Sequence, residues 1–301
     1  MTETTLKEIY PVPDHFRKNA HIQSYEDYKR MWQQSIDDPE TFWGGIAEEY
    51  ITWFDKWDKV MDCNYGDSAE DLYIRWFANA KLNVSYNCLD RHLETRGGQT
   101  AILWEGNEPG DDKQFTYREL HEAVCRFANV LKRNGVKKGD VVTFYLPMIP
   151  ELAIGILACT RVGAIHAVVF GGFSADALRD RIQDSQSMLL VSCDGTYRGA
   201  KAIPQKANAD KAVADCPSIK KHLVIERVGS DKVEVAWNAA TDIWYHEELE
   251  QVDADCPPEK MDAEDPLFIL YTSGSTGNPK GVMHTTGGYL TYAAHTTQWV
   301  F

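Results

Sequence analysis

The sequence has 301 residues, enough for about two domains or for one large α/β unit with a substantial core. Acidic side chains outnumber basic ones by 45 to 31, so the formal net charge is −14 at pH 7. A surface of that charge repels phosphate backbones and anionic lipid, and we find no basic patch that reverses it locally. The composition therefore argues against a nucleic-acid partner and against attachment to a membrane.

Cysteine usage and the opening residues indicate the compartment in which the protein works. The seven cysteines lie far apart, are odd in number and never form Cys-x-x-Cys, which disfavours both a disulfide framework and a zinc site. The first residues lack the basic start and apolar core of a secretory signal, and no stretch approaches 18 consecutive apolar residues. We expect a cytoplasmic protein in a reducing environment.

Residues 1–97 differ in character from the rest of the chain. Five of the nine tryptophans fall here among many charged residues, at positions 32, 43, 53, 57 and 76. Sparse aromatic anchors of this kind favour packed helices over a regular sheet. We predict a helical N-terminal extension over residues 1–97 and an α/β domain over residues 98–301.

The α/β region opens with a turn-like segment that follows an apolar stretch. Residues 101–104 are apolar, and residues 105–113 contain Pro109-Gly110, so a hairpin is expected here. Thr116 then precedes a helical repeat of apolar residues that continues to Asn134 and is closed by a glycine.

From Gly139 onward, apolar runs rich in β-branched residues alternate with helical patterns. This order is typical of the α/β class, so we predict a mostly parallel sheet layered by helices. Residues 229–260 interrupt the alternation and are expected to be irregular. The expected strands are 141–146, 165–170, 188–192, 222–226 and 266–271, and the expected helices are 151–162, 174–185 with Ser174 as N-cap, and 205–215.

The most informative segment follows the last of these strands. Residues 271–281 read YTSGSTGNPKG, with three glycines, four Ser or Thr hydroxyls and one lysine. The glycines allow several backbone N–H groups to converge on an anion, the hydroxyls add donors, and Lys280 adds a positive charge. We predict a phosphate-binding loop, because a simple solvated turn has no need of Pro279-Lys280-Gly281 behind a buried strand.

The P-loop of nucleotide triphosphatases is excluded by register. Its pattern G-x-x-x-x-G-K-[ST], started at Gly274, would need glycine where Pro279 stands. It would also need Ser or Thr in place of Gly281, because that hydroxyl holds Mg²⁺. A kinase or triphosphatase of the P-loop class is therefore disfavoured. We expect the loop to bind phosphate with a different arrangement of donors from that of a P-loop.

The loop is similar to the signature sequence of the adenylate-forming superfamily, which includes acyl-CoA synthetases, luciferases and the adenylation domains of peptide synthetases. Four longer segments resemble the acetyl-CoA synthetase family in particular, and the likeness runs from about Tyr10 through nearly the whole chain. The Trp-rich opening is part of it. The four segments are NVSYNCLDRH (83–92), FGGFSADALRDRIQDS (170–185), TYRGAKAIP (196–204) and LFILYTSGSTGNPKGVMHTTGGYL (267–290).

The resemblance implies a two-step ligase with ATP, CoA and Mg²⁺ as cofactors. Acetate attacks the α-phosphorus of Mg-ATP to give acetyl-adenylate and pyrophosphate, and the CoA thiol then displaces AMP. Because charge develops on the leaving pyrophosphate, fixed N–H donors and the catalytic Lys280 would stabilise the transition state. The residues assigned to the β- and γ-phosphates are Thr272, Ser273, Gly274, Ser275, Thr276, Gly277 and Lys280.

The resemblance also implies a CoA site on two further segments. Arg198 and Lys201 match positions that bind the 3′-phosphate of the ADP moiety, with Gly199 and Ala200 between them. Many members of the family have Arg at the second position, and Lys201 lacks its forked geometry. Gly171-Gly172 match a place where the backbone lies close to the pantetheine arm. On the residues alone, solvated charges and a plain strand-to-helix turn are the alternatives.

Two other groups are interpreted as structural. His284, the histidine closest to the loop, is expected to pack locally and not to act as an acid or base. Asp176, Arg179, Asp180 and Arg181 are expected to be charges on the surface of a helix.

The chain ends at Phe301 inside an expected helix, whereas the resemblance implies a much longer protein. We therefore expect residues 1–301 to be its N-terminal portion and to be inactive alone, with the Mg²⁺ ligands beyond Phe301. The alternatives are a propionate–CoA ligase and a non-catalytic fragment that binds CoA or nucleotide without turnover.

Overall fold

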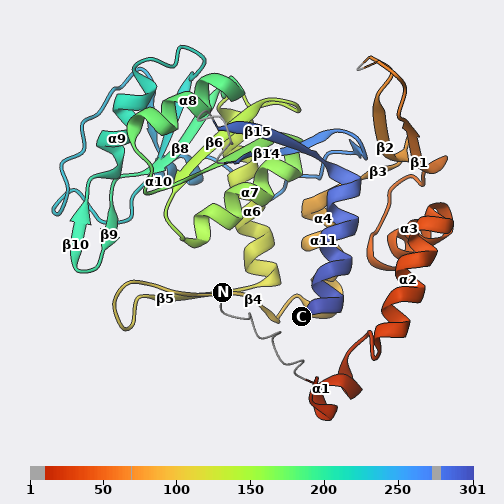
Figure 1. Ribbon diagram of the computed structural model, residues 1–301. Coiled ribbons are helices and arrows are strands. Elements are labelled where there is room, and N and C mark those ends of the chain that lie inside the picture. The colour runs from red at the N-terminus through yellow and green to blue at the C-terminus, as the bar shows by residue number, and fades with distance from the viewer. Residues whose placement is uncertain (1–10, 69, 273–278) are drawn as a thin grey trace, which may run out of the picture.

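The computed structural model describes residues 11–68, 70–272 and 279–301. Its centre is a seven-stranded sheet in the order β12-β11-β8-β6-β7-β14-β15, in which every neighbouring pair is parallel except β14 and β15 (Figure 1). The predicted α/β class with a mostly parallel sheet is confirmed. The strands are β6 (Val141–Leu146), β7 (Ile165–Phe170), β8 (Leu189–Cys193), β11 (Lys221–Ile225), β12 (Asp242–Trp244), β14 (Pro266–Thr272) and β15 (Lys280–Thr285).

Helices cover both faces of this sheet. α6 and α7 pack on one face together with α10, and α8 and α9 pack on the other. Thr116 begins α6 with a capping box to Glu119, and Ser174 caps α8, so both predicted helix starts are confirmed. The bounds are α6 (Tyr117–Arg133), α7 (Pro150–Val162), α8 (Ala175–Ser185), α9 (Gln205–Val213), α10 (Tyr245–Leu249) and α11 (Thr286–Val300).

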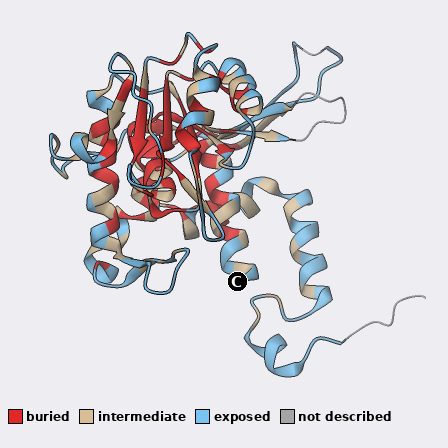
Figure 2. Ribbon diagram, turned by 90° about the vertical axis from the view of Figure 1, so that its left-hand side faces the viewer, coloured by how far each residue is buried: buried red, intermediate tan, exposed pale blue. Residues whose placement is uncertain are grey.

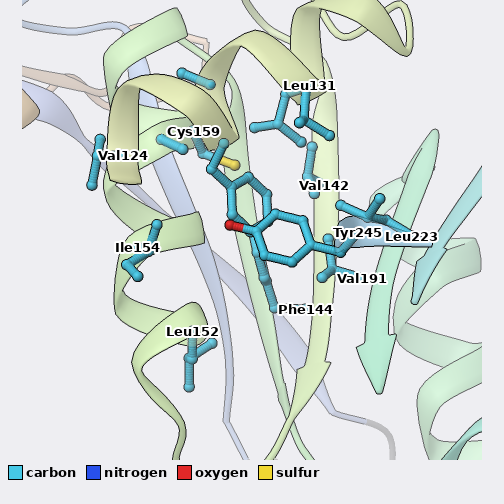
Figure 3. Packing of buried hydrophobic residues seen from close by; sticks show 14 of the residues in the cluster. Val124, Leu131, Val142, Phe144, Leu152, Ile154, Cys159, Val191, Leu223 and Tyr245 are labelled. Atoms are coloured by element: carbon cyan, nitrogen blue, oxygen red, sulfur yellow. The ribbon is translucent and has the colours of Figure 1, made fainter. Parts of the chain in front are cut away.

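The larger hydrophobic core lies between the sheet and the face formed by α6 and α7. Figure 3 shows part of it, with Phe144 from β6 and Tyr245 from α10 at its centre. Side chains alternate along each strand, so Val142 and Phe144 enter this core while Tyr145 enters the smaller core under α8 and α9. Burial therefore concentrates in the sheet and its covering helices, as Figure 2 shows.

Residues 229–260 contain regular structure that the sequence analysis did not predict. β12 and α10 lie in this segment, and β12 extends the parallel sheet by pairing with β11. A strand of three residues is too short to show a period of two. The position of β12 is decided instead by its pairing with β11, which lies about twenty residues earlier in the chain and places His222 opposite Asp242.

The N-terminal extension contains the predicted helices and also a hairpin. Four of the five tryptophans serve as the expected anchors, and the rings of Trp53 and Trp57 both lie about 5 Å from that of the buried Phe77, whereas Trp32 is exposed. The extension is not purely helical, because β1 and β2 pair in antiparallel fashion on the same aromatic cluster. The elements are α1 (Asp14–Asn19), α2 (Tyr25–Asp37), α3 (Pro39–Tyr50), β1 (Lys59–Asn64) and β2 (Tyr73–Ala78).

Short elements join the extension to the sheet domain. β3 pairs with β13 far along the chain, and the predicted hairpin is present as β4 and β5. The domain boundary near Gly97 stays a prediction. These elements are β3 (Lys81–Leu82), α4 (Val84–Cys88), the 3₁₀ helix η1 (Asp90–His92), α5 (Leu93–Arg96), β4 (Thr100–Glu105), β5 (Asp112–Thr116) and β13 (Met261–Asp262).

All seven cysteines are free thiols, and five of them are buried. Across residues 11–68, 70–272 and 279–301, no helix has both the length and the apolar character needed to cross a bilayer.

A mostly buried ion-pair cluster ties η1 to α6 and α7. The Arg161 guanidinium, 3% exposed, donates to both carboxylate oxygens of Asp90 at 2.8 and 2.9 Å. His121 Nε2 lies 3.3 Å from the same carboxylate, and this hydrogen bond, followed by a contact to Cys125, raises the pKa of His121 to about 9. Burial alone would raise the pKa of Asp90, but the hydrogen bonds from His121 and Arg161 outweigh it and hold that pKa well below its usual range.

The raised pKa of His121 predicts a loss of stability in alkaline solution. Its stabilising contribution is complete below the unfolded pKa of about 6.5 and is lost as the pH rises through the folded value. The free energy of unfolding, measured with urea between about pH 7 and pH 10, should fall more steeply in the wild type than in His121→Asn. Parallel pH profiles for the two proteins would contradict this assignment.

Candidate functional site

The predicted phosphate loop connects β14 and β15 at the edge of the central sheet. Thr272 and Lys280 are the last partners of this antiparallel pair, and both are exposed. Lys280 forms no ion pair within the parts of the chain that the structure describes. The other predicted phosphate ligands lie outside the described residues, and their role stays a prediction: Ser273, Gly274, Ser275, Thr276 and Gly277.

Beside the base of this loop lies a cavity of about 310 Å³ between β14 and α8. The Tyr271 hydroxyl donates to Asp184 at 2.7 Å, and burial together with this hydrogen bond raises the pKa of Tyr271. Pro279 forms part of the same wall. Tyr271 therefore fastens the carboxyl end of β14 to α8, and Pro279 faces the same cavity from the other end of the loop.

Arg181 differs from its predicted role as a surface charge. It is 9% exposed, and its guanidinium lies 4.9 Å from the ring of Phe173 and 5.3 Å from that of Tyr271. Its Nη1 donates to the carbonyl of Ala177. Asp176, Arg179 and Asp180 do form the expected exposed ion pairs along α8. The α8 face buried against β14 could be known only from the tertiary structure.

The predicted CoA-binding cations lie at the tip of a short hairpin. β9 (Thr196–Arg198) and β10 (Lys201–Ile203) pair in antiparallel register with Arg198 opposite Lys201, and Gly199 makes the turn with a φ of +58°. Both cations are exposed, and neither forms an ion pair with any described residue. Like charges directly opposite each other repel, and a bound phosphate would relieve that repulsion. The arrangement therefore fits an anionic ligand.

Gly171 and Gly172 follow the carboxyl end of β7, close to the same hairpin. Gln205, which begins α9 directly after the hairpin, donates from Nε2 to the carbonyl of Gly171 at 3.1 Å. A Cβ on Gly171 would lie 2.8 Å from the Leu146 carbonyl oxygen, and one on Gly172 would lie 2.6 Å from the Phe170 ring. Close packing against backbone explains Gly171, whereas Gly172 meets only the ring of the exposed Phe170.

The three predicted segments meet at one edge of the sheet. β8 pairs in parallel with β6, β6 with β7, and β7 with β14, so the carboxyl ends of these strands lie on the same side of the sheet. One predicted segment follows each of β7, β8 and β14. α7 and α8 leave this edge toward opposite faces of the sheet, which is the position at which α/β proteins bind ligands. The structure therefore brings the glycine turn, the cationic hairpin and the ends of the phosphate loop to one side of the molecule.

The β9–β10 hairpin also lines a cavity of about 710 Å³ that was not predicted from the sequence. Tyr197 and Ala202, which pair with each other across the hairpin, face this cavity. Arg227, at the carboxyl end of β11, lies between the rings of Trp104 and Tyr197 at 5.3 and 5.8 Å. Lys232 Nζ donates to the Tyr197 hydroxyl at 3.0 Å. No motif marks these residues, because they come from three separate elements that only the fold brings together.

One cluster among the described residues has the side chains of a metal site: Asp210, His222 and Asp242. The Lys206 ammonium lies 2.8 Å from Asp210 and 2.7 Å from Asp242, so it already occupies the space between the carboxylates. Burial lowers the pKa of His222 to about 4, and its imidazole is neutral at pH 7. We interpret the cluster as an internal ion pair that fastens β12 to α9.

His284 packs locally, as expected. Its ring stacks on Phe268 with centroids 4.6 Å apart and meets the edge of Tyr289 at 5.5 Å.

Two family profiles match consecutive parts of the chain. The profile described as "AMP-binding enzyme" matches residues 89–300, and the profile described as "Acetyl-coenzyme A synthetase N-terminus" matches residues 28–88. The first match covers well over half of the chain. This chain belongs to the family of AMP-binding enzymes.

The curated relatives show which members of this family the chain resembles. The chain is 54% identical over 294 residues to the acetyl-coenzyme A synthetase of Alkalilimnicola ehrlichii, which covers 98% of this chain and 44% of that protein. It is 52% identical over 301 residues to that of Halorhodospira halophila, covering 100% and 45%. Among solved structures, acetoacetyl-CoA synthetase from Streptomyces lividans superposes with a TM-score of 0.82 at 24% identity, covering 95% of this chain and 44% of that one. The chain thus spans less than half the length of these proteins.

The packing at Gly171 predicts the effect of adding one methyl group. Gly171→Ala should lower the free energy of unfolding by about 1 to 3 kcal/mol, because the Leu146 carbonyl is rigid backbone. Gly98→Ala is the matched control, since a Cβ there meets nothing within 4 Å. Equal free energies of unfolding for the two variants in urea denaturation would contradict this, because they would show that the turn accommodates the methyl group without loss of stability.

Proposed function

We propose that this chain is part of an acetate–CoA ligase, which joins acetate to CoA while ATP is cleaved to AMP and pyrophosphate. The observation that carries the proposal is the match of two family profiles, one after the other, over residues 28–300. Relatives named acetyl-coenzyme A synthetase that align over 98 to 100% of the chain support it.

In this proposal the loop between β14 and β15 holds the β- and γ-phosphates of ATP. Lys280 would place its ammonium on the pyrophosphate as negative charge develops there, and the loop N–H and hydroxyl groups would donate to the same oxygens. The placement of Thr272 and Lys280 opposite each other, as the last paired residues of β14 and β15, supports this role because it brings the two ends of the loop together. Mg²⁺ would neutralise the phosphates to which it binds.

The β9–β10 hairpin would bind the 3′-phosphate of CoA. Arg198 and Lys201 stand opposite each other without an acidic partner among the described residues, so they can share one phosphate. The turn at Gly171-Gly172 lies at the same sheet edge, and its backbone would lie close to the pantetheine arm. The two half-reactions would then use neighbouring parts of one surface.

Binding of CoA tests this assignment. Isothermal titration of the 301-residue chain should show Arg198→Ala binding CoA about 10- to 100-fold more weakly than the wild type, because one charge-assisted contact is lost. Lys211→Ala, an exposed cation of α9, is the control and should leave the affinity unchanged. If the wild type binds CoA and Arg198→Ala binds it equally well, the hairpin is not the phosphate anchor.

Binding of Mg-ATP tests the loop separately. Lys280→Ala should weaken binding of Mg-ATP by about tenfold or more while leaving CoA affinity intact, since the two sites use different cations.

We also expect no acetate-dependent pyrophosphate release by residues 1–301 alone, because the chain spans 44% of the first relative's length. Release at a measurable rate would show that this chain holds a complete adenylation site.

A further inference from the structure

Asp194 stands at the junction between the central sheet and the hairpin that carries the proposed CoA anchors. It follows the last residue of β8, and its N–H donates to the carbonyl of Ile225 at 3.0 Å, which continues the pairing of β8 with β11. It is completely buried. A buried carboxylate is costly unless each oxygen is satisfied, so its partners reveal its purpose.

The carboxylate is satisfied by backbone amides alone. Its oxygens accept hydrogen bonds from the N–H groups of Gly195 at 2.6 Å, Arg227 at 2.9 Å, Val228 at 3.2 Å and Gly229 at 2.8 Å. No cationic side chain among the described residues lies within ion-pair distance of it. The charge thus joins the start of the hairpin to the turn that follows β11.

The main chain of the same residue closes the other end of the hairpin. The Asp194 carbonyl accepts hydrogen bonds from the N–H groups of Gln205 at 3.1 Å and Lys206 at 3.2 Å, where the chain leaves β10 and enters α9. One residue therefore holds both the outgoing strand, through Gly195, and the returning strand, through Gln205.

The base of the hairpin has no spare room. A Cβ on Gly195 would lie 2.3 Å from Val228 Cγ2 and 3.0 Å from the carbonyl oxygen of Ile203. Beyond this base, the rest of the chain contacts the hairpin at Tyr197, through Arg227 and Lys232, and at its turn, where Asn107 donates to the Gly199 carbonyl at 3.1 Å. Asp194 is the residue that ties both strands of the hairpin to the central sheet.

We propose that Asp194 is a positioning residue that fixes the hairpin so that Arg198 and Lys201 converge on one phosphate. This inference rests on the proposed function. The residue touches no ligand and acts by holding the backbone on which the two cations stand. The chemistry requires a carboxylate, because asparagine has one acceptor oxygen and would turn its NH₂ group toward donating amides.

The test compares CoA with 3′-dephospho-CoA, because the two ligands differ only in the phosphate that the hairpin would bind. Isothermal titration of the 301-residue chain gives the ratio of the two affinities for the wild type, Asp194→Asn, Arg198→Ala and the double variant. Asp215→Asn, an exposed aspartate after α9, is the matched control. Hydrogen exchange of peptides covering residues 195–204 and 226–230 reports on the hairpin base directly.

We expect Asp194→Asn to reduce the preference for CoA by about tenfold, and the double variant to lose less than the two single variants combined, since both changes act on the same phosphate contact. Exchange should accelerate in the hairpin and in residues 226–230 but not in β6 or α7. A general loss of stability would weaken both ligands equally and leave the ratio unchanged. An unchanged ratio together with unchanged exchange would overturn the proposal.

Two results would require a different reading: misfolding of Asp194→Asn, and a wild type that binds CoA and dephospho-CoA equally. If Asp194→Asn does not fold, Gly195→Ala keeps the carboxylate and displaces the hairpin, so it should reduce the same ratio; an unchanged ratio there overturns the proposal. If the wild type binds CoA and dephospho-CoA equally, the assigned phosphate anchor is wrong and the role of Asp194 toward CoA falls with it. Exchange then decides only whether Asp194 holds the hairpin.

Discussion

The parallel pairing of β7, β6 and β8, continued by β14, is the constraint on which the rest of the structure depends. Parallel strands end on the same edge, so the segments that follow β7, β8 and β14 meet there although they are about 25 to 100 residues apart in the chain. The glycine turn, the cationic hairpin and the phosphate loop are those segments. Because α7 and α8 cover opposite faces, the edge between them is left open for ligands.

Placing like charges together requires a rigid support. Arg198 and Lys201 stand opposite each other at the tip of a short hairpin, and nothing in that hairpin offsets their repulsion. The support comes from its base, where the buried Asp194 carboxylate is satisfied by amides of two separate segments. A buried carboxylate that loses a donor is left unsatisfied at a cost in free energy, which favours the arrangement in which all of its amide donors stay in place.

Sequence reasoning succeeded where the local pattern and the fold agree. The strands β6 and β7 were predicted at their observed bounds, because runs of β-branched and apolar residues bounded by glycine or proline leave little ambiguity. It failed where pairing overrides pattern. β12 has three residues and is placed by its register with β11, the β1–β2 hairpin is held by an aromatic cluster, and Arg181 is buried by a strand almost 90 positions later.

The sequence by itself determined the α/β class, the order of the central elements, the phosphate-loop motif and the family that this motif indicates, because these depend on residue type and spacing along the chain. Only the tertiary structure decided that Arg198 faces Lys201, that Arg227 lies between two rings, and that Asp194 closes the hairpin. Each of these is a contact between segments whose proximity is created by packing, and no local pattern encodes which distant amide a buried carboxylate will meet.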